Sequence, residues 1–331
     1  MLAAWAAFGL RHAPSQAEQA PARVLVHDVA AGITVSDMDR AVNFYSTVLL
    51  FEKGSDVEVA GDEFERLQGV FGARARVVTM RLGDERLELT EYLTPRGRPA
   101  PADARSNDRA LQHVAIIVND MEQAYLWLRR HRVQHVSPGP QGLPDWNPNA
   151  AGIRAFYFRD PDGHALEILQ FPPDKGQPRW QRPSDRVFLG IDHTAIVVGD
   201  TKASLRFYRD ALGMTVVGGS ENHGPEQDNV FGARLRITTL RAAAGPAVEL
   251  LEYLTPRDGR PYPGDARAND LVHWQTIVTT PSPEAIYQAL RAGRHALVSP
   301  RVVSLPEGPL GFREAFLARD PDGHALQFRS R

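Results

Sequence analysis

Apolar and polar positions recur along the chain in an order that predicts a strand, an amphipathic helix and three further strands. The first series begins with an apolar run at Ile33 and continues with apolar residues at helical spacing over 38–50. Three strand-like runs follow and end at 87–93, and a second series restarts at 113–120 and closes at 165–171. The pattern therefore predicts four βαβββ units, which begin near residues 29, 112, 192 and 272.

The two halves of the chain also repeat one another in sequence. Val70-Phe-Gly-Ala-Arg returns at Val230, and Arg159-Asp-Pro-Asp-Gly-His-Ala-Leu returns at Arg319. The Asp-Gly dipeptides within the second motif predict hairpin turns before the last strand of a unit. We expect an N-terminal segment, a first domain of two units, a linker and a second domain of two units, at residues 1–23, 24–171, 172–187 and 188–331.

The composition excludes several classes of function. The chain has 38 Lys and Arg against 40 Asp and Glu, and a net charge of -2 opposes broad electrostatic contact with nucleic acid. A hydrophobic content of 43% with 24% charged residues is typical of a globular protein, and the sequence predicts no transmembrane helix. The chain contains no cysteine, so any metal must be held by His, Asp, Glu or Gln.

The N-terminal segment departs from the globular pattern. An apolar run from Leu2 to Leu10 is followed by small and polar residues up to Ala22. The apolar run fits a clipped secretory signal, but no basic residue precedes it, and a docked or frayed helix fits equally well. We expect a cytoplasmic protein, or a periplasmic one if residues 1–22 are a signal remnant.

Four motifs carry a resemblance to a known family. They are His193-Thr-Ala-Ile-Val-Val, Ser204-Leu-Arg-Phe-Tyr-Arg-Asp-Ala-Leu-Gly-Met, Val248-Glu-Leu-Leu-Glu-Tyr and Asp160-Pro-Asp-Gly-His-Ala-Leu-Glu-Ile-Leu. Across residues 24–329 the chain resembles the vicinal oxygen chelate superfamily, which includes glyoxalase I, methylmalonyl-CoA epimerase, extradiol dioxygenases and bleomycin-resistance proteins. The resemblance implies an α+β fold in which the four βαβββ units pair into two cup-shaped modules.

The resemblance also implies metal-ligand positions inside each cup, on the first and last strands of every unit. These positions, taken unit by unit, are Ala30 and Glu88, His113 and Glu167, His193 and Glu249, and His273 and Gln327. Period-two alternation supports the choice, because it places Glu88 on the same face as Thr90 and Tyr92. One such residue alone is more often a satisfied core side chain. A strand-internal carboxylate is costly to bury unpaired, so their recurrence favours a metal site.

The pairing of the units decides which of these positions meet. If consecutive units pair, both cups are incomplete. If the first unit pairs with the fourth and the second with the third, the two departures from His and Glu fall in one cup. We predict the crossed pairing and a metal site of His113, Glu167, His193 and Glu249. The alternative metal residues are His273, Gln327 and Glu88.

The resemblance implies the reaction type. We expect one divalent ion (Zn, Ni, Mn or Fe(II)) and a glyoxalase-like lyase or isomerase. In this interpretation Glu167 is the base that removes a proton next to the carbonyl of a small carbonyl or thioester substrate. One alternative is an extradiol-type ring-cleaving dioxygenase that uses His193 and His273 with Glu249. The other is a metal-free ligand-binding or resistance protein, against which the complete His-Glu set counts.

Further expectations concern the walls of the cups and the partners. We expect four side chains to line the cups: Tyr92, Tyr253, Trp146 and Arg154. The histidines of the two Asp-Pro-Asp-Gly-His motifs, His164 and His324, are expected to be turn or surface residues, because they have the opposite strand parity from Glu167 and Gln327. The expected partner is a small-molecule substrate, without nucleic acid or membrane, and the expected state is a monomer or homodimer.

Overall fold

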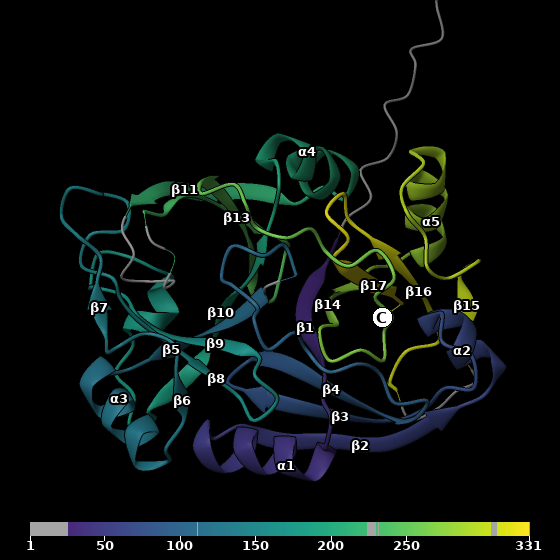
Figure 1. The fold of residues 1–331 in the computed structure, drawn as a ribbon, viewed down its shortest axis with the longest axis horizontal. Coiled ribbons are helices and arrows are strands. Elements are labelled where there is room, and N and C mark those ends of the chain that lie inside the picture. Colours follow the sequence, from purple (N-terminus) through teal and green to yellow (C-terminus); the bar gives the residue numbers. More distant parts are fainter. Residues whose placement is uncertain (1–25, 111, 224–229, 231, 306–309, 331) are drawn as a thin grey trace, which may run out of the picture.

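A computed structural model describes residues 26–110, 112–223, 230, 232–305 and 310–330 (Figure 1). The predicted N-terminal segment 1–23 lies outside the described residues. The first unit comprises β1 (Asp28–Thr34), α1 (Met38–Asn43), the π-helical turn η1 (Phe44–Val48), β2 (Glu52–Ala60), α2 (Asp62–Gln68), β3 (Arg74–Leu82) and β4 (Glu85–Thr94). The second unit comprises β5 (Gln112–Val118), α3 (Met121–Arg130), β6 (Gln134–His135), β7 (Gln141–Gly142), β8 (Arg154–Arg159) and β9 (Ala165–Gln170).

The second half repeats this order after the short helix η2 (Pro178–Gln181) in the linker. The third unit comprises β10 (Phe188–Val197), α4 (Thr201–Leu205), η3 (Arg206–Ala211), β11 (Thr215–His223), β12 (Arg234–Arg241) and β13 (Ala247–Thr255). The fourth unit comprises β14 (Trp274–Thr279), α5 (Pro283–Ala292), β15 (Val303–Ser304), β16 (Glu314–Arg319) and β17 (Ala325–Arg329). The hydrophobic pattern does not predict α2, whose buried side chains Phe64 and Leu67 cover strands of the first and fourth units.

The first helix of each unit begins with a side-chain N-cap. The helices α1, α3, α4 and α5 start after a polar residue whose side chain accepts a hydrogen bond from a backbone N–H of the first turn. Such a cap satisfies one of the N–H groups that have no partner within the helix. The capping residues are Asp37, Asp120, Asp200 and Ser282.

The strands pair across the two halves of the chain. One sheet has the order β15-β16-β17-β14-β1-β4-β3-β2, so it joins the fourth unit to the first. The other has the order β11-β12-β13-β10-β5-β9-β8-β6 and joins the third unit to the second. At the junctions β1 runs antiparallel to β14, and β10 runs antiparallel to β5 (Figure 1). The crossed pairing of units is therefore confirmed, and each sheet curves into one cup.

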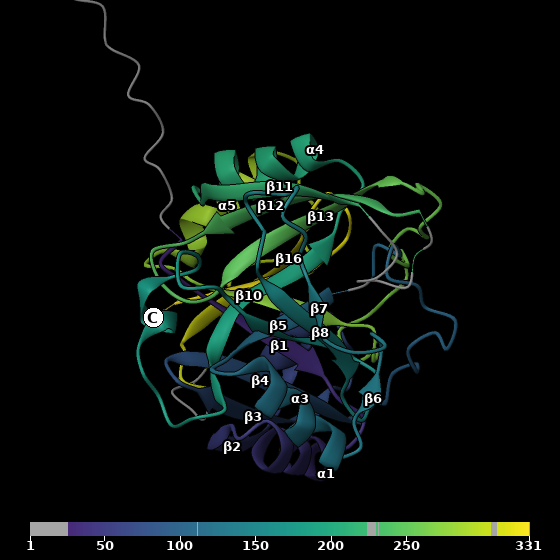
Figure 2. The ribbon, with the colours of Figure 1, turned by 90° about the vertical axis from the view of Figure 1, so that its left-hand side faces the viewer.

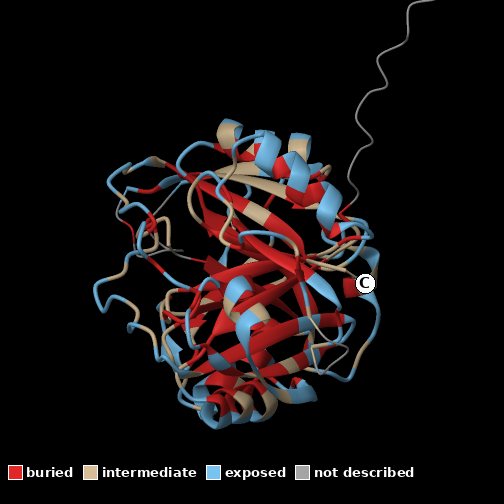
Figure 3. Ribbon diagram, turned by 90° about the vertical axis from the view of Figure 1, so that its right-hand side faces the viewer, coloured by how far each residue is buried: buried red, intermediate tan, exposed pale blue. Residues whose placement is uncertain are grey.

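The hydrophobic cores follow a different grouping from the sheets. One core combines residues of the first and second units, such as Leu89 and Ile116, and another combines the third and fourth, such as Leu250 and Phe316. The helices α1 and α3 lie at one end of the molecule, and α4 and α5 lie at the other (Figure 2). Buried residues follow the strands, while exposed ones gather on the helices and loops (Figure 3). The two units of each half thus share a hydrophobic core, while each sheet joins one unit of the first half to one unit of the second.

Strand alternation divides these cores from the interiors of the cups. On β9, Leu166 and Ile168 belong to the core of the first two units, while Glu167 lies between them on the opposite face. Successive residues of a strand point to opposite sides, so a polar side chain between two core residues faces the cup. Among the described residues, no helix is long and apolar enough to cross a membrane.

His164 and His324 follow their turns as expected, but both are buried and neither is a surface residue. Each ring places Nδ1 beside an aspartate of its own turn, at 2.8 Å from Asp160 Oδ2 and 2.9 Å from Asp320 Oδ2. Each places Nε2 beside a backbone carbonyl of the opposite half, Leu271 for His164 and Arg109 for His324. Because both nitrogens face acceptors, each ring fits the doubly protonated form and links the two halves.

These two histidines predict a pH dependence of stability. Burial alone would lower the pKa of each ring, but the charge and hydrogen bond of the adjacent aspartate outweigh it and raise the pKa. A raised pKa contributes stability that is complete below the unfolded value of about 6.5 and is lost as pH rises through the folded value. We therefore expect the free energy of unfolding to fall as pH is raised above neutrality. Urea unfolding at a series of pH values measures this, and the variant His164→Gln/His324→Gln should show a smaller fall. An equal fall in the variant would contradict the assignment.

Candidate metal centre

Four side chains from four strands converge at the base of the cup formed by the second and third units. His113 lies on β5, Glu167 on β9, His193 on β10 and Glu249 on β13. Glu167 Oε2 is 3.3 Å from His113 Nε2 and 3.5 Å from His193 Nε2. Glu249 Oε2 is 3.5 Å from His193 Nε2. Ligand atoms of His113, Glu167 and His193 all lie within 4.8 Å of one another, which is the spacing of a mononuclear site before an ion draws its ligands in.

The site is buried and strongly polar. His113, Glu167 and His193 are each 5% exposed or less. Burial alone would raise the pKa of Glu167, but the two neighbouring histidines outweigh it and lower the pKa to about 2. For His193, burial would lower the pKa, but Glu249, Asp192 and Glu167 raise it well above its usual value. Three carboxylates around one imidazole are therefore an arrangement that a cation stabilises.

The donor set fits a divalent cation. His113 Nε2 is buried, and its polar neighbour is Glu167 Oε2 at 3.3 Å, without the geometry of a good hydrogen bond. A buried nitrogen whose hydrogen bonding is this poor is costly, and coordination of a metal would use its lone pair. Imidazole nitrogens and carboxylate oxygens together suit Zn, Ni, Mn or Fe(II). Glu249 Oε1 accepts a hydrogen bond of 2.8 Å from Thr239, which leaves Oε2 facing His193.

Asp192 holds the ring of His193 from behind. Its Oδ2 lies 3.2 Å from His193 Nδ1, and its Oδ1 accepts hydrogen bonds of 3.0 Å from both Trp180 Nε1 and Arg241 Nη2. Consecutive residues of a regular strand face opposite sides, but the β10–β5 register shifts between Ile191 and His193. Such a shift is typical of a β-bulge, and it brings the Asp192 carboxylate beside Nδ1 of His193. Asp192 is not among the residues expected from the sequence, where its position directly before His193 is the one sign of its role.

We expect Asp192→Asn to weaken metal binding by about 10–100-fold, because a carboxylate beside a ligating histidine orients the ring and raises its basicity. Calorimetric titration of the metal-free protein measures the affinity. Asp174→Asn is a matched control, since Asp174 is an exposed carboxylate of the linker. Unchanged affinity in Asp192→Asn would show that Asp192 has no part in the site.

A cavity of about 550 Å³ opens above the four side chains. Its walls combine apolar and polar side chains in similar proportion, and the polar ones include Tyr157 on β8 and Thr239 on β12. Tyr157 is the register partner of Glu167, and its ring stands edge-on to His113 with the ring centres 5.4 Å apart. The size and lining suit a small organic substrate that reaches the base of the cup with its polar end.

Three other predicted residues, Glu88, His273 and Gln327, belong to the first and fourth units and thus to the second cup. The sheet register corrects one position there. Glu167 is aligned with Ala115, and Gln327 is aligned with Ile277, so the position of His113 corresponds to Gln275 and not to His273. His273 directly precedes β14, and burial lowers its pKa to about 3.

The ligand set of the dioxygenase alternative is not assembled in this structure. His193 lies on the sheet of the second and third units, and His273 adjoins the sheet of the first and fourth. The two histidines therefore belong to different sheets and are not placed to share an ion. The combination of His193 and His273 with Glu249 is wrong for this reason.

The four expected wall residues do not line the metal cavity as far as the described residues show. Tyr92 is buried beside Phe64 of α2, and Tyr253 belongs to a small cluster of apolar side chains. Trp146 is exposed, with its ring against His223, and Arg154 lies 3.8 Å from Glu122. The tyrosines have the predicted strand parity, but they stand near the ends of β4 and β13, where neighbouring side chains cover them.

Comparison with known proteins agrees with this architecture. A family model described as Glyoxalase/Bleomycin resistance protein/Dioxygenase superfamily matches residues 25–168 and 190–328. A virulence protein of Salmonella typhimurium, STM3117, is 29% identical over 143 residues, which are 41% of this chain and 81% of that protein.

Two solved structures share the fold over 93% of this chain. Glyoxalase I from Zea mays is 16% identical, with a TM-score of 0.56 and 92% of its chain covered. A protein described as a putative dioxygenase from Bacillus subtilis is 14% identical, with a TM-score of 0.57 and 86% of its chain covered. At these identities the likeness concerns the fold, because one fold supports unrelated reactions.

Proposed function

The chain belongs to the Glyoxalase/Bleomycin resistance protein/Dioxygenase superfamily, and we propose that it is a divalent-metal-dependent, glyoxalase-like lyase or isomerase. In this proposal it removes a proton next to the carbonyl of a small carbonyl or thioester substrate. The observation that carries the proposal is the convergence of His113, Glu167 and His193, with Glu249 beside His193.

The presence of a second carboxylate supports this reaction type. Three ligands of an octahedral ion leave three positions open, whereas the addition of Glu249 leaves two, which suits two neighbouring oxygens of one substrate. A divalent cation bound there would stabilise negative charge that develops on a carbonyl oxygen. Thr239 fixes one oxygen of Glu249 and leaves the other facing His193.

Glu167 is placed to act as the base. Its carboxylate lines the cavity, where a substrate carbon can approach it. The two imidazole rings hold the carboxylate in position from two sides. A positioned carboxylate can take the proton from one carbon and return it to the neighbouring atom, which is the step that a lyase or isomerase of this kind needs.

One observation favours a second candidate, an extradiol-type dioxygenase. His113, His193 and Glu167 alone form a set of two histidines and one carboxylate, which is the ligand set of many Fe(II) oxygenases. The two functions differ in whether Glu249 is also a ligand. They also differ in whether the protein consumes oxygen.

Hydrogen exchange in D2O distinguishes the two. The protein is loaded with one metal at a time and incubated with α-hydroxy-carbonyl compounds or acyl thioesters, and loss of the proton next to the carbonyl is followed by NMR. We expect exchange that stops when the metal is removed by a chelator and returns when it is restored. Absence of exchange together with oxygen consumption by the Fe(II)-loaded protein on catechols would reject the lyase or isomerase in favour of the dioxygenase.

A further inference from the structure

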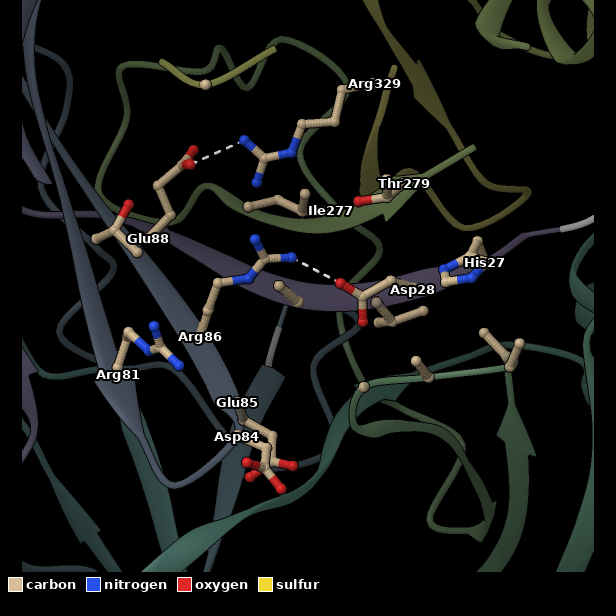
Figure 4. Close-up of a pocket in the computed structure, with 18 of the residues that line it drawn as sticks. His27, Asp28, Arg81, Asp84, Glu85, Arg86, Glu88, Ile277, Thr279 and Arg329 are labelled. Carbon is tan, nitrogen blue, oxygen red and sulfur yellow. Dashed lines mark hydrogen bonds and ion pairs between the residues drawn. The ribbon is translucent and has the colours of Figure 1, made fainter. Parts of the chain in front are cut away.

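The second cup, between the first and fourth units, encloses a cavity of about 980 Å³, larger than the cavity of the metal centre. Figure 4 shows the charged side chains that surround it. The sheet register gives this cup the same four positions as the metal centre, occupied by Ala30, Glu88, Gln275 and Gln327. A methyl group and two neutral amides thus replace two histidines and one glutamate. Only the carboxylate of Glu88 remains, at the position that corresponds to Glu249.

A fixed cation accompanies that carboxylate. Arg329 on β17 occupies the position of Leu169 in the other cup, and its Nη1 is 3.0 Å from Glu88 Oε2. Both side chains are 11% exposed. Figure 4 shows the guanidinium of Arg329 turned towards Glu88 across the cavity. A side chain of the protein therefore supplies the positive charge that a metal would supply in the other cup.

The arginines of this cavity differ in how many of their donors are used. Arg86 is paired with Asp28 at 2.6 Å, and Arg241 with Asp192 at 3.0 Å. For Arg329, Glu88 is the one acceptor found among the described residues, although a guanidinium carries several N–H donors in a planar fork. Arg81 has no hydrogen-bond or ion-pair partner among the described residues (Figure 4). The walls thus offer guanidinium donors without acceptors.

The base of the cup also contains polar side chains without partners. Gln327 and Gln275 are each at least nine-tenths buried, and neither side-chain oxygen has a hydrogen-bond partner among the described residues. Strand alternation places both on the same face as Ile277, which lines the cavity, although the two glutamines are not themselves part of its lining. Unpaired buried polar groups are costly, so the strands behind this wall also keep a polar character that a purely apolar core would not have.

We propose that this cavity is a second binding site, independent of metal, for a small organic oxyanion. A carboxylate or phosphate group fits Arg329, because either can accept two parallel N–H donors from a guanidinium. Arg81 adds a second cation to the same cavity, and Glu88 holds the Arg329 fork in place from its other side. The two cups would then bind different ligands by different means, one through a metal and the other through arginine.

The variants must separate this site from the metal centre. Gln177 and Arg241 line both cavities, and Arg241 also holds Asp192 behind His193, so a change at either residue affects both sites. The change Glu88→Gln/Arg329→Gln removes both charges of the buried pair together and leaves no carboxylate without its partner. Arg329→Lys is a second variant, which keeps a cation beside Glu88 but lacks the planar fork.

The full chain is first freed of metal by a chelator, which is then removed. It is then titrated in a calorimeter with malonate and, separately, with inorganic phosphate. We expect saturable binding at one site, unchanged in His193→Ala and in the control Arg130→Gln, whose exposed arginine lies at the end of α3. In Glu88→Gln/Arg329→Gln the affinity should fall by about tenfold or more, the effect of losing a hydrogen bond to a charged group. The affinity for the anion should also fall measurably in Arg329→Lys. This single variant provides the test if the double variant does not fold.

The two probes distinguish the sources of the oxyanion. Tighter binding of malonate assigns a carboxylate ligand, and tighter binding of phosphate assigns a phosphate ester. The proposal is overturned if neither probe binds saturably, if binding persists unchanged in both Arg329 variants, or if His193→Ala abolishes it. The last outcome would place the anion in the metal cup.

Discussion

The change Glu167→Gln is expected to slow the proton-transfer reaction by about 10²–10⁴-fold while the protein keeps much of its metal affinity. The amide retains an oxygen that can bind a cation, but it has no basic carboxylate to accept a proton. The NMR exchange rate of the metal-loaded variant in D2O, compared with that of the parent, measures the effect. Metal content is determined on the same sample, so that loss of metal is not mistaken for loss of the base.

Glu249→Gln is the matched comparison, because it makes the same chemical change on the neighbouring carboxylate of the site. Glu249 Oε2 lies 3.5 Å from His193 Nε2, whereas Glu167 lies between the two histidines. We expect Glu249→Gln to retain more of the exchange activity than Glu167→Gln at equal metal occupancy. The reverse order of rates would transfer the role of base to Glu249.

The change His193→Ala is expected to abolish both metal binding and activity. His193 Nε2 contacts both carboxylates, so its removal leaves Glu167 and Glu249 with no imidazole between them. The loss in metal affinity should exceed the 10–100-fold loss that is typical for a residue behind a ligand, such as Asp192. His273→Ala is the matched control, because His273 is equally buried but adjoins the other sheet. Loss of metal in His273→Ala, with retention in His193→Ala, would contradict the crossed arrangement.

Much of this site follows from the sequence because strand alternation and repetition act on the same residues. Glu167 stands between Leu166 and Ile168, and a charged residue between two core residues must face away from the core. The repeats then show that similar positions recur in other units. Of the eight positions expected from the sequence, Ala30 and Gln327 lack His or Glu, and the crossed pairing is the one that puts both in a single cup.

Three features needed the structure because they depend on register or on distant chain segments. The chain between the register partners Ile277 and Gln327 is two residues shorter than the one between Ala115 and Glu167, so equal spacing selects His273 where the register selects Gln275. Asp192 reaches His193 because the pairing of β10 with β5 is irregular at this point, and the hydrophobic pattern of the sequence does not reveal such an irregularity. His164 is buried because its ring meets the Leu271 carbonyl of the other half, a contact that sequence parity does not indicate.

The stoichiometry of metal bound to the purified chain tests the central claim most directly. The protein is freed of metal, reconstituted with each of Zn, Ni, Mn and Fe(II), separated from unbound ions and measured by elemental analysis. One complete set of ligands in the cup of the second and third units predicts about one ion per chain, which disappears in His193→Ala and persists in Glu88→Gln/Arg329→Gln. No bound ion with any of the four metals, or two equivalent ions per chain, would contradict a single metal centre.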